Sequence, residues 1–67
     1  MKQNIMTPQD IVQTLIMIGW KQIEISRAIG LSQPNISRIA AGTQGVRWKQ
    51  MDALRELLNK PVPRYSK

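Results

Sequence analysis

The stretch from Gln22 to Ala41 constrains the fold of this chain more than any other, and it reads QIEISRAIGLSQPNISRIAA. It predicts two short helices separated by Gly30, because a glycine that adopts a left-handed conformation ends a helix. Two helices cross steeply over a short turn only where a small side chain lies at the crossing, and Ser26 supplies one. Ile36 and Ile39 turn the second helix inward and leave its other face free. Helices arranged in this way can place one of the pair in a DNA major groove.

The rest of the chain also favours helices. Thr7, Pro8 and Asp10 have the order of an N-cap, a first-turn proline and a first-turn acidic residue. No stretch alternates like a strand and no segment repeats, so we expect an all-α, compact domain of four, at most five, helices. The expected helices lie between residues 7 and 19, over 22–29, over about 33–41 and over about 48–59. The expected parts are a flexible leader (1–6), a helix-turn-helix domain (7–59) and an extended tail (60–67).

The predicted core comes from apolar residues at helical spacing. We expect both tryptophans to lie in this core, with Trp20 closing the corner between the first two helices. The first helix is expected to turn Ile11, Val12, Leu15, Ile16 and Ile18 inward. The later helices are expected to add Ile25, Ile29, Ile36, Ile39, Ala40, Met51, Leu54, Leu57 and Leu58.

Composition narrows the class of function. The chain has 67 residues with a net charge of +6, which favours anionic partners and nucleic acid first among them. It has no cysteine and no histidine, so disulfides and thiolate chemistry are excluded and only carboxylates remain as metal ligands. The four acidic residues are scattered, so we expect no enzyme, no metal, no cofactor and no small-molecule ligand. The longest apolar run near the N-terminus, Leu15 to Ile18, is too short to span a membrane, and we expect a cytoplasmic, nucleoid-associated protein.

From about Trp20 to Leu58 the chain resembles the Cro/repressor-type helix-turn-helix (XRE) family of phage and bacterial transcriptional regulators. The residues that carry the resemblance are Gln22, Ile25, Ser26, Ile29, Gly30, Leu31, Ser32, Gln33, Ile36, Ser37, Ile39 and Gly42. Two positions depart from the family pattern: many relatives have alanine in place of Ser26, and threonine or serine in place of Lys21. The second departure removes a side-chain N-cap acceptor. The resemblance implies a lambda-repressor-like DNA-binding domain.

The free face of the second helix of the pair carries polar side chains that suit base recognition. Gln33 with Ser37, and Pro34 with Arg38, are four residues apart and project side by side. Glutamine bonds bidentately to adenine and arginine to guanine, whereas Pro34 offers only an apolar contact. The resemblance implies that these four residues contact bases. It further implies that Gln22 bonds a phosphate and buttresses Gln33.

A second set of residues is expected to contact the DNA backbone. Arg47 and Lys49 lie at the start of the last helix, where free N–H groups and two cations favour a phosphate. The loop after the preceding helix is expected to reach the same strand. The full expected backbone set is Lys21, Gln22, Asn35, Thr43, Gln44, Arg47 and Lys49.

These expectations together describe a sequence-specific, double-stranded DNA-binding regulator, a small Cro-like repressor that occludes a promoter. One such helix buries too little surface to select a site, so we expect a homodimer, at least on DNA, on a palindromic operator. The expected dimer contacts are Leu57, Leu58, Val62 and Tyr65, although the two leucines also suit the core of a single chain. Three alternatives stay open: an antitoxin of the same fold, a basic protein-interaction module that does not contact DNA bases, and a single-strand binder, which requires exposed tryptophans.

Overall fold

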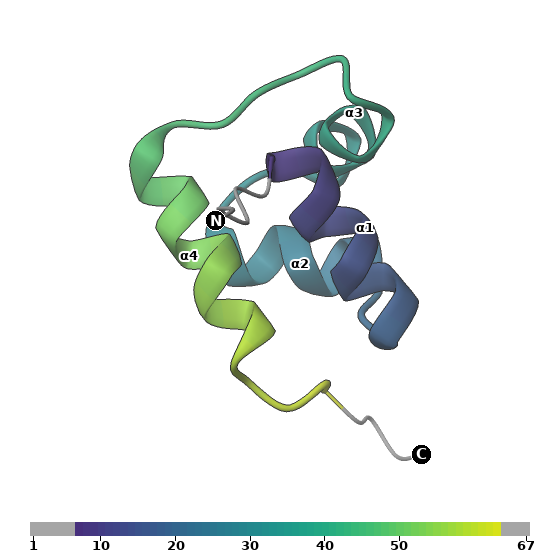
Figure 1. Cartoon of the computed structure of the whole chain (residues 1–67). Coiled ribbons are helices and arrows are strands. Elements are labelled where there is room, and N and C mark those ends of the chain that lie inside the picture. The colour runs from purple at the N-terminus through teal and green to yellow at the C-terminus, as the bar shows by residue number, and fades with distance from the viewer. Residues whose placement is uncertain (1–6, 64–67) are drawn as a thin grey trace, which may run out of the picture.

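A computed structural model describes residues 7–63 of the chain, and within that range it contains four helices and no strand. The helices are α1 (Pro8–Ile18), α2 (Gln22–Ile29), α3 (Gln33–Ala41) and α4 (Trp48–Leu58) (Figure 1). The prediction of a small four-helix, all-α domain is therefore confirmed. The expected leader (1–6) and the end of the expected tail (64–67) lie outside the described residues. Residues 61–63 of the tail have no regular secondary structure.

The first helix begins with the predicted cap. The Thr7 hydroxyl accepts a hydrogen bond from the Asp10 N–H at 3.1 Å, and the Asp10 carboxylate accepts one from the Thr7 N–H at 3.2 Å. This reciprocal pair satisfies two backbone donors that the helix itself leaves unpaired. Pro8 occupies the first turn, where its missing N–H costs little.

The second helix starts without a side-chain acceptor at its N-cap, Lys21, as its sequence predicts. Glu24 compensates in part, because its carboxylate accepts a hydrogen bond from the Lys21 N–H at 2.9 Å. Glu24 is also buried, and the helix begins at Gln22 as predicted.

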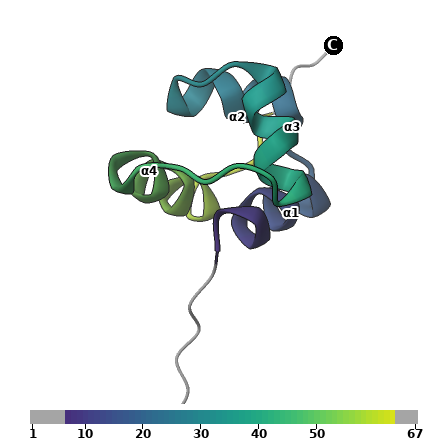
Figure 2. The ribbon, with the colours of Figure 1, turned by 90° about the horizontal axis from the view of Figure 1, so that it is seen from above.

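The core lies where α1 and α2 pack against α3 and α4. In Figures 1 and 2, α4 lies to the left and α3 to the right, and the segment 42–47 connects them. Each fully buried aliphatic side chain contributes about 1.5–3 kcal/mol to folding. The buried apolar residues are Ile11, Val12, Leu15, Trp20, Ile25, Ile36, Ile39, Leu54 and Leu57. Partly buried against them are Ile29, Leu31, Ala40, Val46, Met51, Leu58 and Val62.

Three residues expected in the core are exposed. Ile16 and Ile18 are 37% and 50% exposed, because the inward stripe of α1 is narrower than its apolar pattern and the helix ends at the edge of the domain (Figure 1). Trp48 is 72% exposed, so the prediction that both tryptophans are buried is wrong for this residue. Burial along α4 is complete only from Leu54, about two turns after Trp48, and the first turn of the helix lies outside the core.

Candidate nucleic-acid interface

The turn between α2 and α3 fixes how the two helices meet. Gly30 ends α2 with φ +78°, in the left-handed region that a side chain disfavours. The N–H groups of Gly30 and Leu31 both donate to the carbonyl oxygen of Ser26, at 2.9 and 3.0 Å. The side chain of Ser26 is itself buried and donates to the carbonyl oxygen of Ile23 at 2.8 Å. The small residue and the glycine thus lie where the sequence predicts them, and together they hold a tight turn.

The third helix begins just after this turn. The Ser32 hydroxyl accepts a hydrogen bond from the Asn35 N–H at 3.4 Å, so Ser32 is the predicted N-cap. Pro34 lies in the first turn, where no N–H is needed. The start of α3 is thereby defined by residues of the helix itself and of the turn before it.

One face of α3 packs inward and the opposite face is open to solvent. Ile36 and Ile39 are fully buried. The structure brings the four expected base-contacting side chains together on the open side, and we call this set the exposed α3 face. Its members are Gln33, Pro34, Ser37 and Arg38, all of them exposed.

The expected partner of this face, Gln22, is half-buried at the start of α2. No hydrogen bond joins its side chain to that of Gln33 in the described part of the chain. The buttress that the resemblance implies stays a prediction.

The end of α3 is tied to α1 by two side chains that the sequence analysis did not single out. Gln9 and Gln13 both donate a side-chain amide to the carbonyl oxygen of Ala40, at 3.3 and 2.8 Å. The two glutamines are four residues apart and lie on one side of α1, which is the only sequence signal for a shared role. These bonds fix the last turn of α3 against α1.

Gly42 follows α3 with φ +83°, and a Cβ placed on it would lie 2.9 Å from the side-chain oxygen of Gln9. The next residue, Thr43, donates from both its N–H and its hydroxyl to the carbonyl oxygen of Arg38, at 3.0 and 3.2 Å. The left-handed backbone therefore favours glycine here, and a larger residue would also have to displace the side chain of Gln9.

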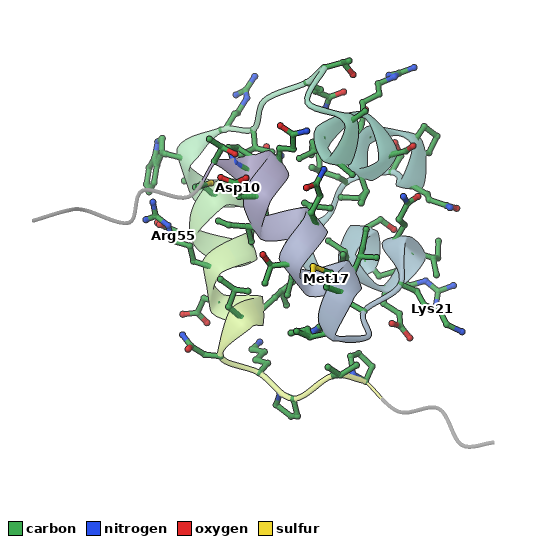
Figure 3. All side chains as sticks on the ribbon, turned by 45° about the vertical axis from the view of Figure 1, so that its right-hand side comes forward. Asp10, Met17, Lys21 and Arg55 are labelled. Atoms are coloured by element: carbon green, nitrogen blue, oxygen red, sulfur yellow. The ribbon has the colours of Figure 1, made fainter. Side chains whose placement is uncertain are left out.

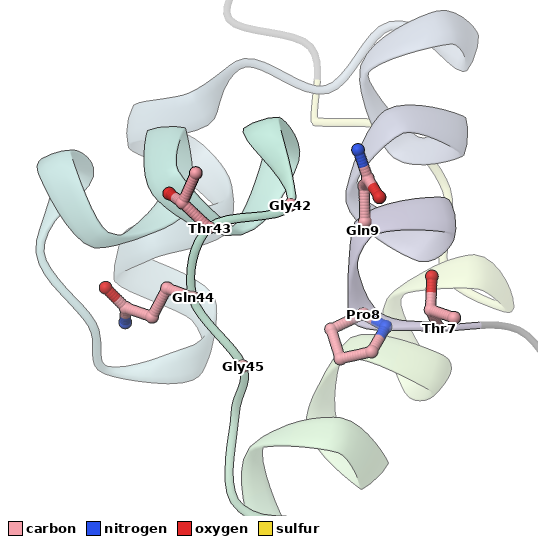
Figure 4. A pocket seen from close by; sticks show the side chains of 7 residues that line it. All are labelled: Thr7, Pro8, Gln9, Gly42, Thr43, Gln44 and Gly45. Carbon is pink, nitrogen blue, oxygen red and sulfur yellow. The ribbon is translucent and has the colours of Figure 1, made fainter.

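A hollow of about 400 Å³ lies between the start of α1 and the segment after α3 (Figure 4). Thr43 and Gln44, two of the expected backbone contacts, form one wall of it. The residues of the other wall, at the start of α1, were not predicted to belong to a site. The lining residues are Thr7, Pro8, Gln9, Gly42, Thr43, Gln44 and Gly45.

A second hollow, of about 560 Å³, lies at the start of α4. Arg47 and Lys49 line it as exposed cations, together with Trp48 and Gln50. The N–H of Arg47 donates to the side-chain oxygen of Gln50 at 3.0 Å, which defines the beginning of the helix. Both expected phosphate-binding cations thus line one hollow at the start of α4.

Among the described residues, the acidic side chains do not neutralise the positive charges of Arg38, Arg47 and Lys49. Asp10 and Glu24 accept hydrogen bonds from backbone N–H groups at helix starts. Within residues 7–63 the one ion pair joins Arg55 to Asp52, at 3.9 Å. Lys21 lies on the opposite side of the molecule from Arg55 (Figure 3). Arg38, Arg47 and Lys49 therefore have no carboxylate partner in the described part of the chain.

The expected dimer residues are mostly occupied within a single chain. Leu57 is buried in the core, and Leu58 and Val62 are half-buried against it. Val62 approaches Gly19, where an added Cβ would lie 3.2 Å from a Val62 methyl carbon. Tyr65 lies outside the described residues. The dimer surface stays a prediction.

Neither a metal-type acidic cluster nor a membrane-length apolar helix lies within residues 7–63. That range contains no group of three or more acidic side chains that is arranged to hold a metal ion. None of its helices is long and apolar enough to cross a membrane. Comparison with known proteins identifies no relative, since no family model, curated protein or solved structure matches the chain.

Proposed function

We propose that this protein is a sequence-specific, double-stranded DNA-binding regulator that places α3 in the major groove. The observation that carries the proposal is the exposed α3 face, on which amide, hydroxyl and guanidinium groups lie together on a helix held at both ends. Gln33 and Arg38 are the side-chain types that distinguish adenine and guanine in the major groove. The resemblance of the sequence to Cro/repressor-type regulators supports the same assignment.

The residues around α3 would position the helix on the duplex. Phosphate contacts fix the register of a protein on DNA and carry no sequence information themselves. Arg47 and Lys49 suit this role because they are exposed and free of carboxylate partners. The other residues of the proposed backbone set are Lys21, Gln22, Asn35, Thr43 and Gln44.

In this proposal the protein acts as a repressor, by covering promoter DNA and excluding the polymerase. Recognition by a single short helix buries too little surface for high specificity, so two copies would bind a palindromic operator. The protein would then be cytoplasmic and associated with the nucleoid. Neither a cofactor nor a small-molecule ligand takes part.

A second candidate is an antitoxin or another basic protein-interaction module with this fold. Its support is the set of exposed apolar side chains on α1 and α2. Met17 is 85% exposed, Ile18 50% and Ile23 40%, and a protein partner would bury this apolar surface. This candidate predicts that alanine at Gln33 and Arg38 leaves affinity for the protein partner unchanged.

Selection of binding sites from a random duplex pool, at about physiological salt, tests the proposal. The expected result is one enriched motif made of two inverted half-sites about one helical turn apart. A selection that enriches no sequence, with only weak and salt-sensitive binding, would contradict base recognition and favour the protein-partner candidate. Copurification of an unrelated protein would favour an antitoxin.

A further inference from the structure

The large side chain of Trp48 does not pack in the core. Its exposed fraction of 72% contrasts with 6% for Trp20, although both were expected in the core. The apolar surface of a solvent-exposed indole ring gives no burial free energy unless a partner covers it, and it then adds to the affinity for that partner. The position of Trp48 therefore points to a partner surface.

The surroundings of Trp48 define the chemistry of that partner. Arg47 and Lys49 flank it in the sequence, and all three line the hollow at the start of α4. The Lys49 ammonium lies 5.7 Å from the centre of the indole ring, near the outer limit of a cation–π contact. No acidic side chain lines this hollow. A complementary partner must offer anionic groups beside an apolar surface.

A second copy of this chain is a poor occupant, because two such surfaces facing each other would bring four cations together without a carboxylate. A single strand with unstacked bases is also disfavoured, since such binders use several aromatic residues in succession. Trp20 and Trp48 are the aromatic residues in the described part of the chain, and Trp20 is buried. A duplex backbone fits better, because it presents sugars between phosphates.

The position of Trp48 along the chain agrees with this partner. The segment 42–47 leads directly from the end of α3 to Trp48 and runs along the top of the molecule in Figure 1. Only six residues therefore separate the helix proposed to enter the groove from the start of α4.

We propose that the Trp48 ring packs against a deoxyribose of double-stranded DNA, between the phosphates bound by Arg47 and Lys49. This inference rests on the proposed function and adds to it a contact that is uncharged and independent of sequence. Trp48 then strengthens binding to every duplex without changing which sequence is preferred. Because the contact releases no counterion, it leaves the salt dependence of binding unchanged.

The test uses the full chain and a labelled duplex of random sequence, so no operator is needed. Binding is followed by anisotropy of the label and, separately, by tryptophan emission. Trp48→Ala removes the ring, and Trp48→Phe keeps a flat apolar side chain while leaving Trp20 as the one tryptophan. Because Trp48 is exposed, both variants should melt close to the wild-type temperature, which circular dichroism checks.

We expect Trp48→Ala to weaken binding about 5- to 10-fold, with the slope of log affinity against log salt unchanged. Trp48→Phe should keep most of the affinity. Wild-type emission should change when the duplex binds, and the emission of Trp48→Phe should not.

The other possible results distinguish failure of the Trp48 contact from failure of the proposed DNA binding. Normal wild-type binding with unaltered emission, or Trp48→Ala binding as tightly as wild type, overturns the inference and leaves the proposed function standing. No anisotropy change for the wild type, at any salt concentration, overturns the proposed function and the inference together. A changed salt slope in Trp48→Ala would mean that the variant has disturbed the neighbouring cations, and it would overturn the assignment of an uncharged contact.

Discussion

Gln13 donates its side-chain amide to the carbonyl oxygen of Ala40 over 2.8 Å, which joins the middle of α1 to the last turn of α3. Gln9, one turn earlier, donates to the same oxygen at 3.3 Å. The last carbonyl groups of a helix lack partners within that helix, so an external donor is favourable there. The helix proposed to enter DNA is therefore held by its cap at one end and by α1 at the other.

Gln13→Ala should lower the free energy of unfolding by about 1 kcal/mol, because one hydrogen bond is lost from a surface that water can partly reach. In a domain of this size that loss corresponds to a fall in melting temperature of about 4–8 °C. Thermal unfolding followed by circular dichroism measures it. Met17→Ala is the control, since Met17 lies on the same helix and is 85% exposed. Equal melting temperatures for the two variants would show that the bond to Ala40 does not stabilise the domain.

Gly42→Ala should destabilise the domain more than Gly30→Ala. Both glycines have left-handed backbones, φ +83° and φ +78°, so alanine at either position costs about 1–2 kcal/mol in strain. At Gly30 an added Cβ meets nothing within 4 Å, whereas at Gly42 it lies 2.9 Å from the side-chain oxygen of Gln9. Gln9 can move away, but it then loses its bond to Ala40.

The extra cost at Gly42 should be no more than about 1 kcal/mol, the value of that one bond. Urea unfolding of the two variants, each with and without Gln9→Ala, isolates it. In the Gln9→Ala background the difference between the two glycine sites should shrink toward zero. A difference that persists there would show that something other than Gln9 makes Gly42 necessary.

Arg38→Ala should cost about 1–3 kcal/mol on the best binding site and relax the preference at one base pair. The reason is that its exposed guanidinium lies beside Pro34 on the exposed α3 face and has no carboxylate partner. Arg27→Ala removes the same charge from the last turn of α2 and serves as the control. Affinities for the selected site and for single-base variants of it give the answer. A loss of equal size on random DNA would argue against contact with a base.

Arg47→Ala should weaken binding to all sequences by similar factors and reduce the salt slope by about one unit. Each cation that neutralises a phosphate releases a counterion, and Arg47 lies free at the start of α4. Arg55→Ala is the matched control on the same helix, because Arg55 already pairs with Asp52. The measurement is affinity for one duplex over a range of salt concentrations. A slope identical to that of wild type would remove Arg47 from the phosphate contacts.

The parts of the fold predicted correctly from the sequence are those decided within a few residues. Thr7 and Asp10 cap each other across three positions, and the Ser32 hydroxyl accepts a hydrogen bond from the Asn35 N–H at the start of α3. Gly30 and Gly42 end helices because glycine adopts their left-handed backbone conformation without steric cost. The helix boundaries, and with them the composition of the exposed α3 face, follow from these local rules.

The parts missed depend on contacts between segments far apart in the chain. Gln9 and Gln13 bond Ala40 across 31 and 27 positions, and their sequence surroundings give no sign of that partner. Trp48 was misplaced for a related reason. Helical spacing indicates which side of α4 faces inward, but it does not indicate where along the helix the core begins. In the structure full burial begins at Leu54.

The most direct test of the account is the ratio of affinities for a selected duplex and for the same duplex with its sequence scrambled. Both are measured for the wild-type chain at one, physiological, salt concentration, so that backbone attraction contributes equally to each. The account predicts that the selected duplex binds about 10³-fold more tightly, or better, because the exposed α3 face contacts its bases. Equal affinities would contradict the account, since they would mean that the cations bind DNA while α3 does not distinguish one base sequence from another.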